Sequence, residues 1–250
     1  MAGHSKWANI QHRKGKQDKI RAKQFTKVGR EIIVAAKLGG GDPDMNPRLR
    51  LAISKAKAVN MPNDRIKRAI QTGSGGTDTA DYEEVRYEGY GPGGTAIMID
   101  ALTDNRNRTV AEVRMAMTKF GGTLGEAGAV GFMFDRKGQI IYPANKADAE
   151  AMFEAAVEAG AENCESGDQI HEIITAPDDL AAVRDALEEK FGEAEKSDLI
   201  WQPNTLSELD EDQASTMMKL IEALEDDDDV QTVTTNMDVA DDILEKLAAE

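Results

Sequence analysis

Residue types that commonly carry chemistry or cross-link a fold are scarce in this 250-residue sequence. Its one cysteine, Cys164, excludes an internal disulfide and suits a reducing compartment. Its three histidines share no metal-ligand spacing with that cysteine, and no serine or cysteine lies in a nucleophile motif. No stretch approaches the ~20 consecutive apolar residues of a membrane span, and the N-terminus lacks the apolar segment of a signal peptide. We therefore expect a cytoplasmic, non-enzymatic protein with no cofactor and no membrane partner.

Four consecutive aspartates, Asp226-Asp227-Asp228-Asp229, are the main exception, because carboxylate oxygens are the ligands that Mg²⁺ prefers. A run of this kind between a helix and a strand is more often a solvated loop. We interpret it as a loop and expect no metal site.

Charge is divided very unevenly along the chain. The formal net charge is −16, yet residues 1–72 hold 17 lysines and arginines against 5 acidic residues, a net of +12. Residues 73–250 carry a net of −28. A basic segment attracts a polyanion, and an acidic remainder repels the same polyanion. The division predicts nucleic acid as the partner of the N-terminal segment. The alternative is a solvated basic surface without a partner.

The strongest feature within the basic segment is an amphipathic helix predicted from Lys16 to Leu38. Its apolar residues fall on one side at steps of three and four. At 100° per residue, six cations fall within an arc of roughly 80° on the other side, with no acidic residue among them. Such a row would bind phosphates without regard to sequence. The expected contacts of this row, called here the basic stripe, are Lys16, Lys19, Lys23, Lys27 and Arg30; Lys37 is the sixth cation.

The segment before this helix adds further candidates for nucleic-acid binding: Lys6, Trp7, His12, Arg13 and Lys14. Trp7 would stack on a base, or else pack into the helical bundle, as a lone aromatic near an N-terminus more often does.

Two changes of pattern divide the chain into domains. Three predicted helices fill residues 1–72, and the Gly/Ser-rich residues 73–79 predict a linker. Residues 80–132 supply two strands and a helix, and residues 205–250 supply a strand, a helix, a strand and a short last helix. Residues 133–204 are nearly self-sufficient, beginning with a hairpin that turns at Arg136-Lys137-Gly138. We predict an α+β fold with an N-terminal three-helix domain and two ferredoxin-like α/β domains, of which 133–204 is inserted into the other.

Four segments resemble the YebC/PmpR family, which includes the mitochondrial translational activator of cytochrome c oxidase subunit I. They read GHSKWANI at 3–10, GGGDP at 39–43, YEGYGPGG at 87–94 and TDNRNRT at 103–109. The resemblance runs along essentially the whole chain and is loosest over 135–204. It implies one helical and two α/β domains in a cytoplasmic protein described as a DNA-binding transcriptional regulator. Some members act instead in translation, on the ribosome.

The two central segments hold residues for a second anion or partner site: Tyr90, Asn105, Arg106 and Arg108. A helix starting near Asn107 would offer its N-terminal amides and two arginines to a phosphate or carboxylate. Alternatively, the asparagines cap the helix and the arginines tether the loop to the acidic surface. The residues themselves leave both interpretations open.

We rank a DNA-binding transcriptional regulator first, on what the resemblance implies, and a ribosome- or RNA-binding translation factor second. A metal-dependent enzyme is a remote third. The chain has neither a recognisable helix-turn-helix nor the aromatic strand signature of a common RNA-binding module. No pattern in the sequence indicates an oligomeric state.

Overall fold

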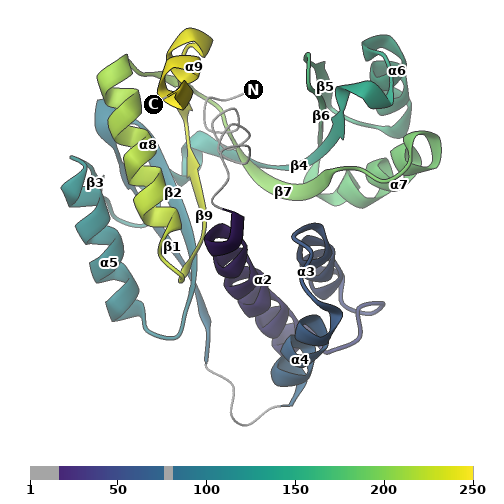
Figure 1. The fold of residues 1–250 in the computed structure, drawn as a ribbon, viewed down its shortest axis with the longest axis horizontal. Coiled ribbons are helices and arrows are strands. Elements are labelled where there is room, and N and C mark those ends of the chain that lie inside the picture. Colours follow the sequence, from purple (N-terminus) through teal and green to yellow (C-terminus); the bar gives the residue numbers. More distant parts are fainter. Residues whose placement is uncertain (1–16, 76–80, 250) are drawn as a thin grey trace. The chain divides into compact units, whose positions relative to one another are not determined.

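The computed structural model describes residues 17–75 and 81–249, with the backbone alone for residues 17–21 and a few residues of the last helix. The chain forms two compact units, residues 1–133 with 203–250 and residues 134–202 (Figure 1). Both helices and sheets are present, which confirms the predicted α+β class. None of the helices in the described ranges is long and apolar enough to cross a membrane.

The described part of the first unit begins with three helices: α2 (Gln17–Gly39), α3 (Pro47–Ala58) and α4 (Asn63–Ser74). The apolar side of α2 forms a small core with α3 and α4, in which Ile32, Leu49 and Ile66 are buried. Asn46 joins α2 to α3 because its side chain accepts a hydrogen bond from the Leu49 amide and donates to the carbonyl of Ala35. The helical spacing in the sequence thus predicted this packing correctly.

The predicted linker begins two residues too early. Residues 73 and 74 belong to α4, although their Gly-Ser sequence is typical of a flexible segment. Gly73 is buried where α4 meets α2, and a Cβ atom there would collide with the Ile33 carbonyl oxygen. Glycine at position 73 therefore allows α4 to pack closely against α2.

A four-stranded sheet in the order β3-β1-β2-β9 forms the body of the first unit. Its strands are β1 (Glu83–Tyr90), β2 (Ala96–Thr103), β3 (Thr123–Leu124) and β9 (Val230–Thr235). Helices α5 (Arg106–Lys119) and α8 (Glu211–Glu225) cover one face (Figure 1). Strands β8 (Ser207–Glu208) and β10 (Met237–Asp238) pair in parallel, and α9 (Asp241–Ala249) ends the chain.

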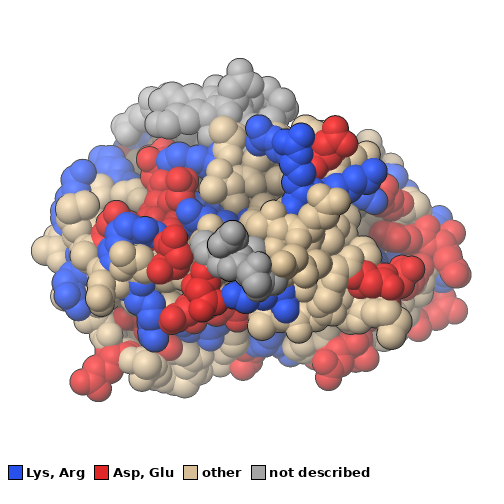
Figure 2. All heavy atoms as spheres, turned by 90° about the horizontal axis from the view of Figure 1, so that it is seen from below, with Lys and Arg blue, Asp and Glu red and all other residues tan. Residues whose placement is uncertain are grey.

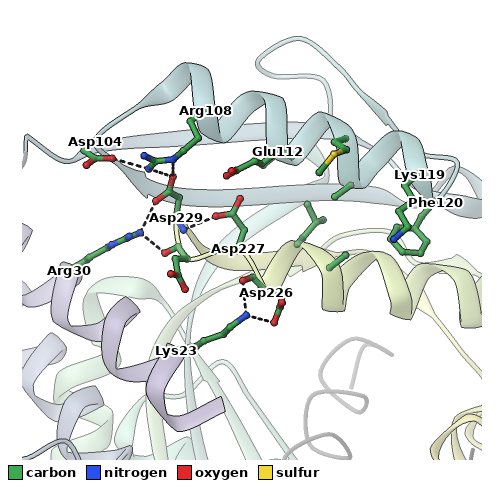
Figure 3. A pocket seen from close by; sticks show the side chains of 16 residues that line it. Lys23, Arg30, Asp104, Arg108, Glu112, Lys119, Phe120, Asp226, Asp227 and Asp229 are labelled. Atoms are coloured by element: carbon green, nitrogen blue, oxygen red, sulfur yellow. Dashed lines mark hydrogen bonds and ion pairs between the residues drawn. The ribbon is translucent and has the colours of Figure 1, made fainter. Parts of the chain in front are cut away.

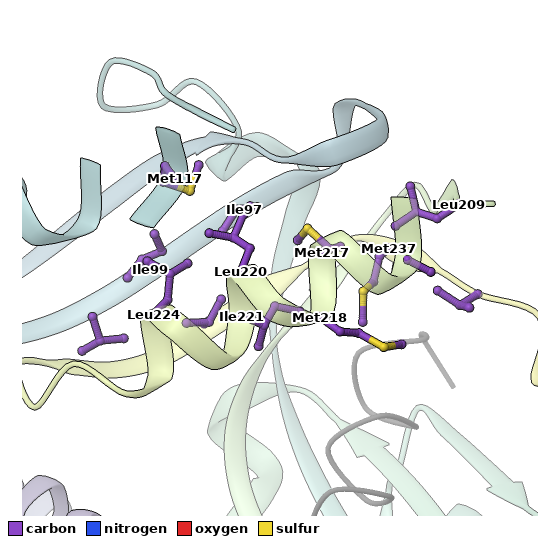
Figure 4. Close-up of a cluster of buried hydrophobic side chains, with 14 of the residues drawn as sticks. Ile97, Ile99, Met117, Leu209, Met217, Met218, Leu220, Ile221, Leu224 and Met237 are labelled. Carbon is purple, nitrogen blue, oxygen red and sulfur yellow. The ribbon is translucent and has the colours of Figure 1, made fainter. Parts of the chain in front are cut away.

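Apolar side chains from α5, α8 and the sheet form the largest core of this unit (Figure 4). Ile97 and Ile99 lie two residues apart on β2 and so point to the same face. Both are fully buried, as are Met117 of α5 and Leu220 of α8. This core fixes α5 against β1 and β2, and so fixes the positions of the charged side chains along α5.

The second unit has the order β4 (Phe134–Pro143), α6 (Ala149–Ala159), β5 (Asn163–Ser166), β6 (Ile170–Thr175), α7 (Leu180–Phe191) and β7 (Lys196–Pro203). Its sheet order, β5-β6-β4-β7, is that of a ferredoxin-like fold. The sheet of the first unit has the same spatial arrangement, with β3, β1, β2 and β9 in the places of β5, β6, β4 and β7. The chain order differs in one respect, because β1 comes before β2 in the sequence and its counterpart β6 comes after β4 and β5.

The hairpin predicted at residues 131–142 is not formed, because β4 runs through Arg136, Lys137 and Gly138 as one strand. Gly138 pairs with Thr175 of β6, and a Cβ atom there would collide with the Thr175 hydroxyl. The glycine that resembles a turn residue instead allows a close contact between strands.

Candidate nucleic-acid interface

Of the residues predicted to bind nucleic acid, the structure describes the side chains of three: Lys23, Lys27 and Arg30. All three lie on α2, on the side away from its apolar core. Lys19 is placed on α2 by its backbone alone. The remaining candidates lie outside the described residues: Lys6, Trp7, His12, Arg13, Lys14 and Lys16.

The three described cations contact a segment about 200 residues away, residues 225–229, called here the acidic loop. Figure 3 shows the contacts of Lys23 and Arg30. Lys23 pairs with the Asp226 carboxylate and donates to its carbonyl oxygen at 2.8 Å. Lys27 donates to the Glu225 carbonyl oxygen at 2.7 Å, and Arg30 pairs with Asp229 at 2.8 Å. Within this unit, the described cations of the basic stripe, Lys23, Lys27 and Arg30, therefore face the acidic loop.

The contact covers much of each cation. The side chains of Lys23 and Arg30 are 25% and 17% exposed. Burial lowers the pKa of Lys27, although nearby acidic side chains act in the opposite direction. Burial likewise raises the pKa of Glu225 against the effect of Lys27. Sequence analysis missed this contact because its partners are far apart in the chain; their opposite charges were the only signal.

Asp229 is the centre of the acidic loop's hydrogen bonding and is 2% exposed. One carboxylate oxygen accepts from Arg108 at 2.6 Å and from Thr109 at 2.8 Å, and the other accepts from Arg30. Burial works against its charge, but these donors hold the pKa of Asp229 below its usual value. The carboxylate stays ionised and links α2, α5 and β9.

At the start of α5, Asn105 and Arg108 are arranged as in the alternative interpretation, in which the asparagines cap the helix and the arginines tether the loop to the acidic surface. Asn105 caps α5 by accepting from the Arg108 amide at 3.1 Å. The Arg108 guanidinium bridges Asp229 and Asp104, and hydrogen bonding to Asp229 raises its pKa. The predicted site also included Arg106, which pairs instead with Glu83 at 3.6 Å.

Tyr90 lies far from these residues. In the β1–β2 pairing, Glu83 is opposite Thr103 and Tyr90 is opposite Ala96, so Tyr90 is at the other end of the sheet from Asn105. Seven residue steps of about 3.3 Å each, about 23 Å in all, separate the two ends of this strand pair. The Tyr90 hydroxyl donates to the Ala129 carbonyl oxygen at 3.0 Å. The structure does not bring the four predicted residues into one site.

Carboxylates of Glu112, Asp227 and Asp229 come within 4.8 Å of one another beside the acidic loop. They line a cavity of about 760 Å³ together with cations of α2 and α5 (Figure 3). Asp229 is already bound by two guanidinium groups. Burial, and then the negative charge of Asp227, raises the pKa of Glu112, which favours a proton there. The protein's own cations thus reduce the negative charge of the cluster.

Other cations of the helical domain are paired as well. Lys37 pairs with Asp81 at 2.6 Å, and Arg48 pairs with both Glu31 and Glu84. On much of the face drawn in Figure 2, basic and acidic groups lie beside one another. A polyanion that binds at these paired cations must exchange with carboxylates of the protein.

Comparisons with known proteins cover nearly the whole chain. The model of the TACO1/YebC protein N-terminal domain matches residues 5–76, and the model of the TACO1/YebC second and third domain matches residues 82–237. A crystal structure of a conserved hypothetical protein from Aquifex aeolicus is 47% identical, with a TM-score of 0.85 over 93% of this chain and 96% of that chain. These findings confirm the resemblance seen in the motifs and are consistent with a nucleic-acid-binding regulator. The chain belongs to the TACO1/YebC family.

Proposed function

We propose that this protein is a non-enzymatic, cytoplasmic, nucleic-acid-binding regulator of gene expression, and specifically a DNA-binding regulator of transcription. The observation that supports it most is the basic stripe of α2. Lys23, Lys27 and Arg30 lie on one side of a formed helix whose opposite side is fixed in a core. Cations held in a row by a helix bind phosphates and release the counterions of the nucleic acid.

The alternative is a translation factor that binds RNA or the ribosome, because the family also bears the name of a translational activator. Both functions would use the same basic stripe, since phosphate contacts carry no base information. Crosslinking in cells, followed by sequencing of the attached nucleic acid, distinguishes them. A defined set of promoters supports the first function, and ribosomal RNA supports the second.

Binding by the basic stripe requires exchange with the acidic loop. Lys23 and Arg30 now neutralise Asp226 and Asp229, so a phosphate must replace a carboxylate at each cation. The exchange costs little at Lys23, because Asp226 is 65% exposed and an exposed ion pair is worth only about 0–1 kcal/mol. At Lys23 the acidic loop therefore lowers affinity and does not block binding.

A salt titration tests the basic stripe. The change is Lys19→Glu with Lys23→Glu, and the matched control is Lys57→Glu with Lys67→Glu, which alters the charge equally on exposed parts of α3 and α4. About five phosphate contacts predict a slope of log K against log salt near −4.5 for duplex DNA and near −3.5 for a single strand. The stripe variant should flatten that slope by about 1.5 to 2.

Circular dichroism checks that both variants keep their helices, which is expected because Glu and Lys have nearly equal helix propensities. The control variant should keep the wild-type slope. Equal slopes for wild type and the stripe variant, with helicity intact, would mean that the stripe makes no phosphate contacts.

A further inference from the structure

A second basic surface lies on the sheet-containing part of the first unit, beside the outer edge of β1. There a groove of about 530 Å³ is lined by β1, by the turn after α5 and by one side of α5. Strand β3 pairs only with Gly89 and Tyr90, so the rest of β1 has no neighbouring strand on this side among the described residues. The groove is open to solvent along this uncovered edge.

Two arginines of α5 supply its charge. Arg106 and Arg114 line it on the same row as Val110 and Thr118. Arg86 of β1 also borders it, but its side chain pairs with Asp100 and so lies on the other face of the sheet from Ile99 and α5. Helix α5 carries four cations and one acidic residue, in a body that is otherwise strongly acidic. Its other side, with Arg108 and Glu112, faces the acidic loop. One helix thus separates an acidic cavity from a basic groove.

The carboxylates around the groove leave this charge accessible. Arg114 is exposed and makes no ion pair or hydrogen bond with any described residue. Arg106 and Glu83 form a loose pair at 3.6 Å, with both side chains more than half exposed. Arg86 pairs with Asp100 at 2.7 Å. Glu88 lines the groove too, but its carboxylate accepts hydrogen bonds from the backbone amides of Gly128, Val130 and Gly131.

We propose that this groove binds successive phosphates of a single-stranded nucleic acid, as a second contact for the polymer held by the basic stripe. The proposal rests on the proposed function. Guanidinium groups match phosphate oxygens through paired hydrogen bonds, and exposed ion pairs such as Arg106–Glu83 give way readily. Grooves that follow a single strand are positively charged in this manner.

The spacing favours a polymer over a small anion. Arg106 and Arg114 are eight residues apart, about 12 Å along the helix axis, so one phosphate does not suffice for both. A groove of this volume holds a ligand of drug size, which corresponds to a short piece of extended strand and not to a duplex. Two weak sites on one chain bind a polymer far more tightly than either alone.

The test measures the affinity of the full chain for two probes, an oligothymidylate of ten nucleotides and an oligoglutamate of similar charge. The variant is Arg106→Ala with Arg114→Ala, both at exposed positions that favour alanine in a helix. The matched control is Lys119→Ala with Lys219→Ala, which removes two charges from other parts of the same domain. The groove variant should bind oligothymidylate about tenfold more weakly, with a salt slope flatter by about 1.4. The control variant should match wild type.

Each outcome decides between the two proposals. Loss of binding in the groove variant but not in the Lys19→Glu, Lys23→Glu variant supports the groove and overturns the basic stripe. Loss in the stripe variant alone overturns the groove. A wild-type chain that binds no oligothymidylate overturns both. Binding of oligoglutamate that is tighter than that of oligothymidylate and depends on Arg106 and Arg114 would show an acidic peptide as the ligand, and overturns the phosphate assignment.

Discussion

At the scale of single residues, buried carboxylates organise the first unit. Glu88 is 8% exposed, and its two carboxylate oxygens accept hydrogen bonds from three backbone amides of the loop at residues 128–131. Burial disfavours its charge, yet these donors keep the pKa of Glu88 below its ordinary value of 4.5. One side chain therefore holds the loop that follows β3 against the sheet.

Changing Glu88 to Gln should lower the free energy of unfolding by about 2 kcal/mol at pH 7, because one amide donor loses its acceptor and the charge assistance is lost. A lowered pKa contributes stability above pH 4.5, and this contribution is lost as the pH falls through the folded-state pKa. The difference between wild type and variant should therefore shrink as the pH falls below 4.5. Urea unfolding at pH 7 and pH 3.5 measures it.

Glu126→Gln, at an exposed position nearby, is the control and should change stability by less than about 0.5 kcal/mol. A difference between wild type and Glu88→Gln that stays constant across this pH range would contradict the role given to the ionised carboxylate.

At the scale of elements, helical periodicity predicted α2 well, because its apolar and basic residues repeat at steps of three and four. The same reasoning failed at Gly73 and Gly138. Both glycines resemble turn or linker residues, but each lies where two backbones approach closely. That requirement comes from a partner element distant in sequence, so no local pattern carries it.

Two glycine-to-alanine changes in the helical domain should have opposite effects. Gly73→Ala places a methyl group against the Ile33 carbonyl and should lower the free energy of unfolding by about 1–3 kcal/mol. Gly29→Ala meets nothing within 4 Å and should raise it by up to about 1 kcal/mol, from helix propensity alone. Thermal unfolding of both variants measures the effects. Similar changes in stability from the two would contradict the close packing of α4 on α2.

At the scale of the whole molecule, the charge division along the sequence predicted a basic N-terminal segment and an acidic remainder. It did not predict that Lys23, Lys27 and Arg30 contact the acidic loop. Nor did it predict that Arg86 and Arg114 line a groove with Arg106, since they belong to two elements and to no common motif. Both arrangements depend on contacts made by the fold.

The central claim is that the basic stripe binds nucleic acid in exchange for the acidic loop, and neutralising the acidic loop tests it most directly. Asp226→Asn with Asp228→Asn removes two negative charges there, and Asp168→Asn with Asp178→Asn removes two at exposed positions of the second unit. Affinity for nucleic acid is measured for both variants and wild type at 50 mM and 200 mM salt. The loop variant should bind nucleic acid roughly two- to tenfold more tightly than wild type at 50 mM salt. This gain in affinity should be smaller at 200 mM salt, because salt screens the charges. Unchanged or weaker binding by the loop variant, or an equal gain in the control variant, would contradict the account.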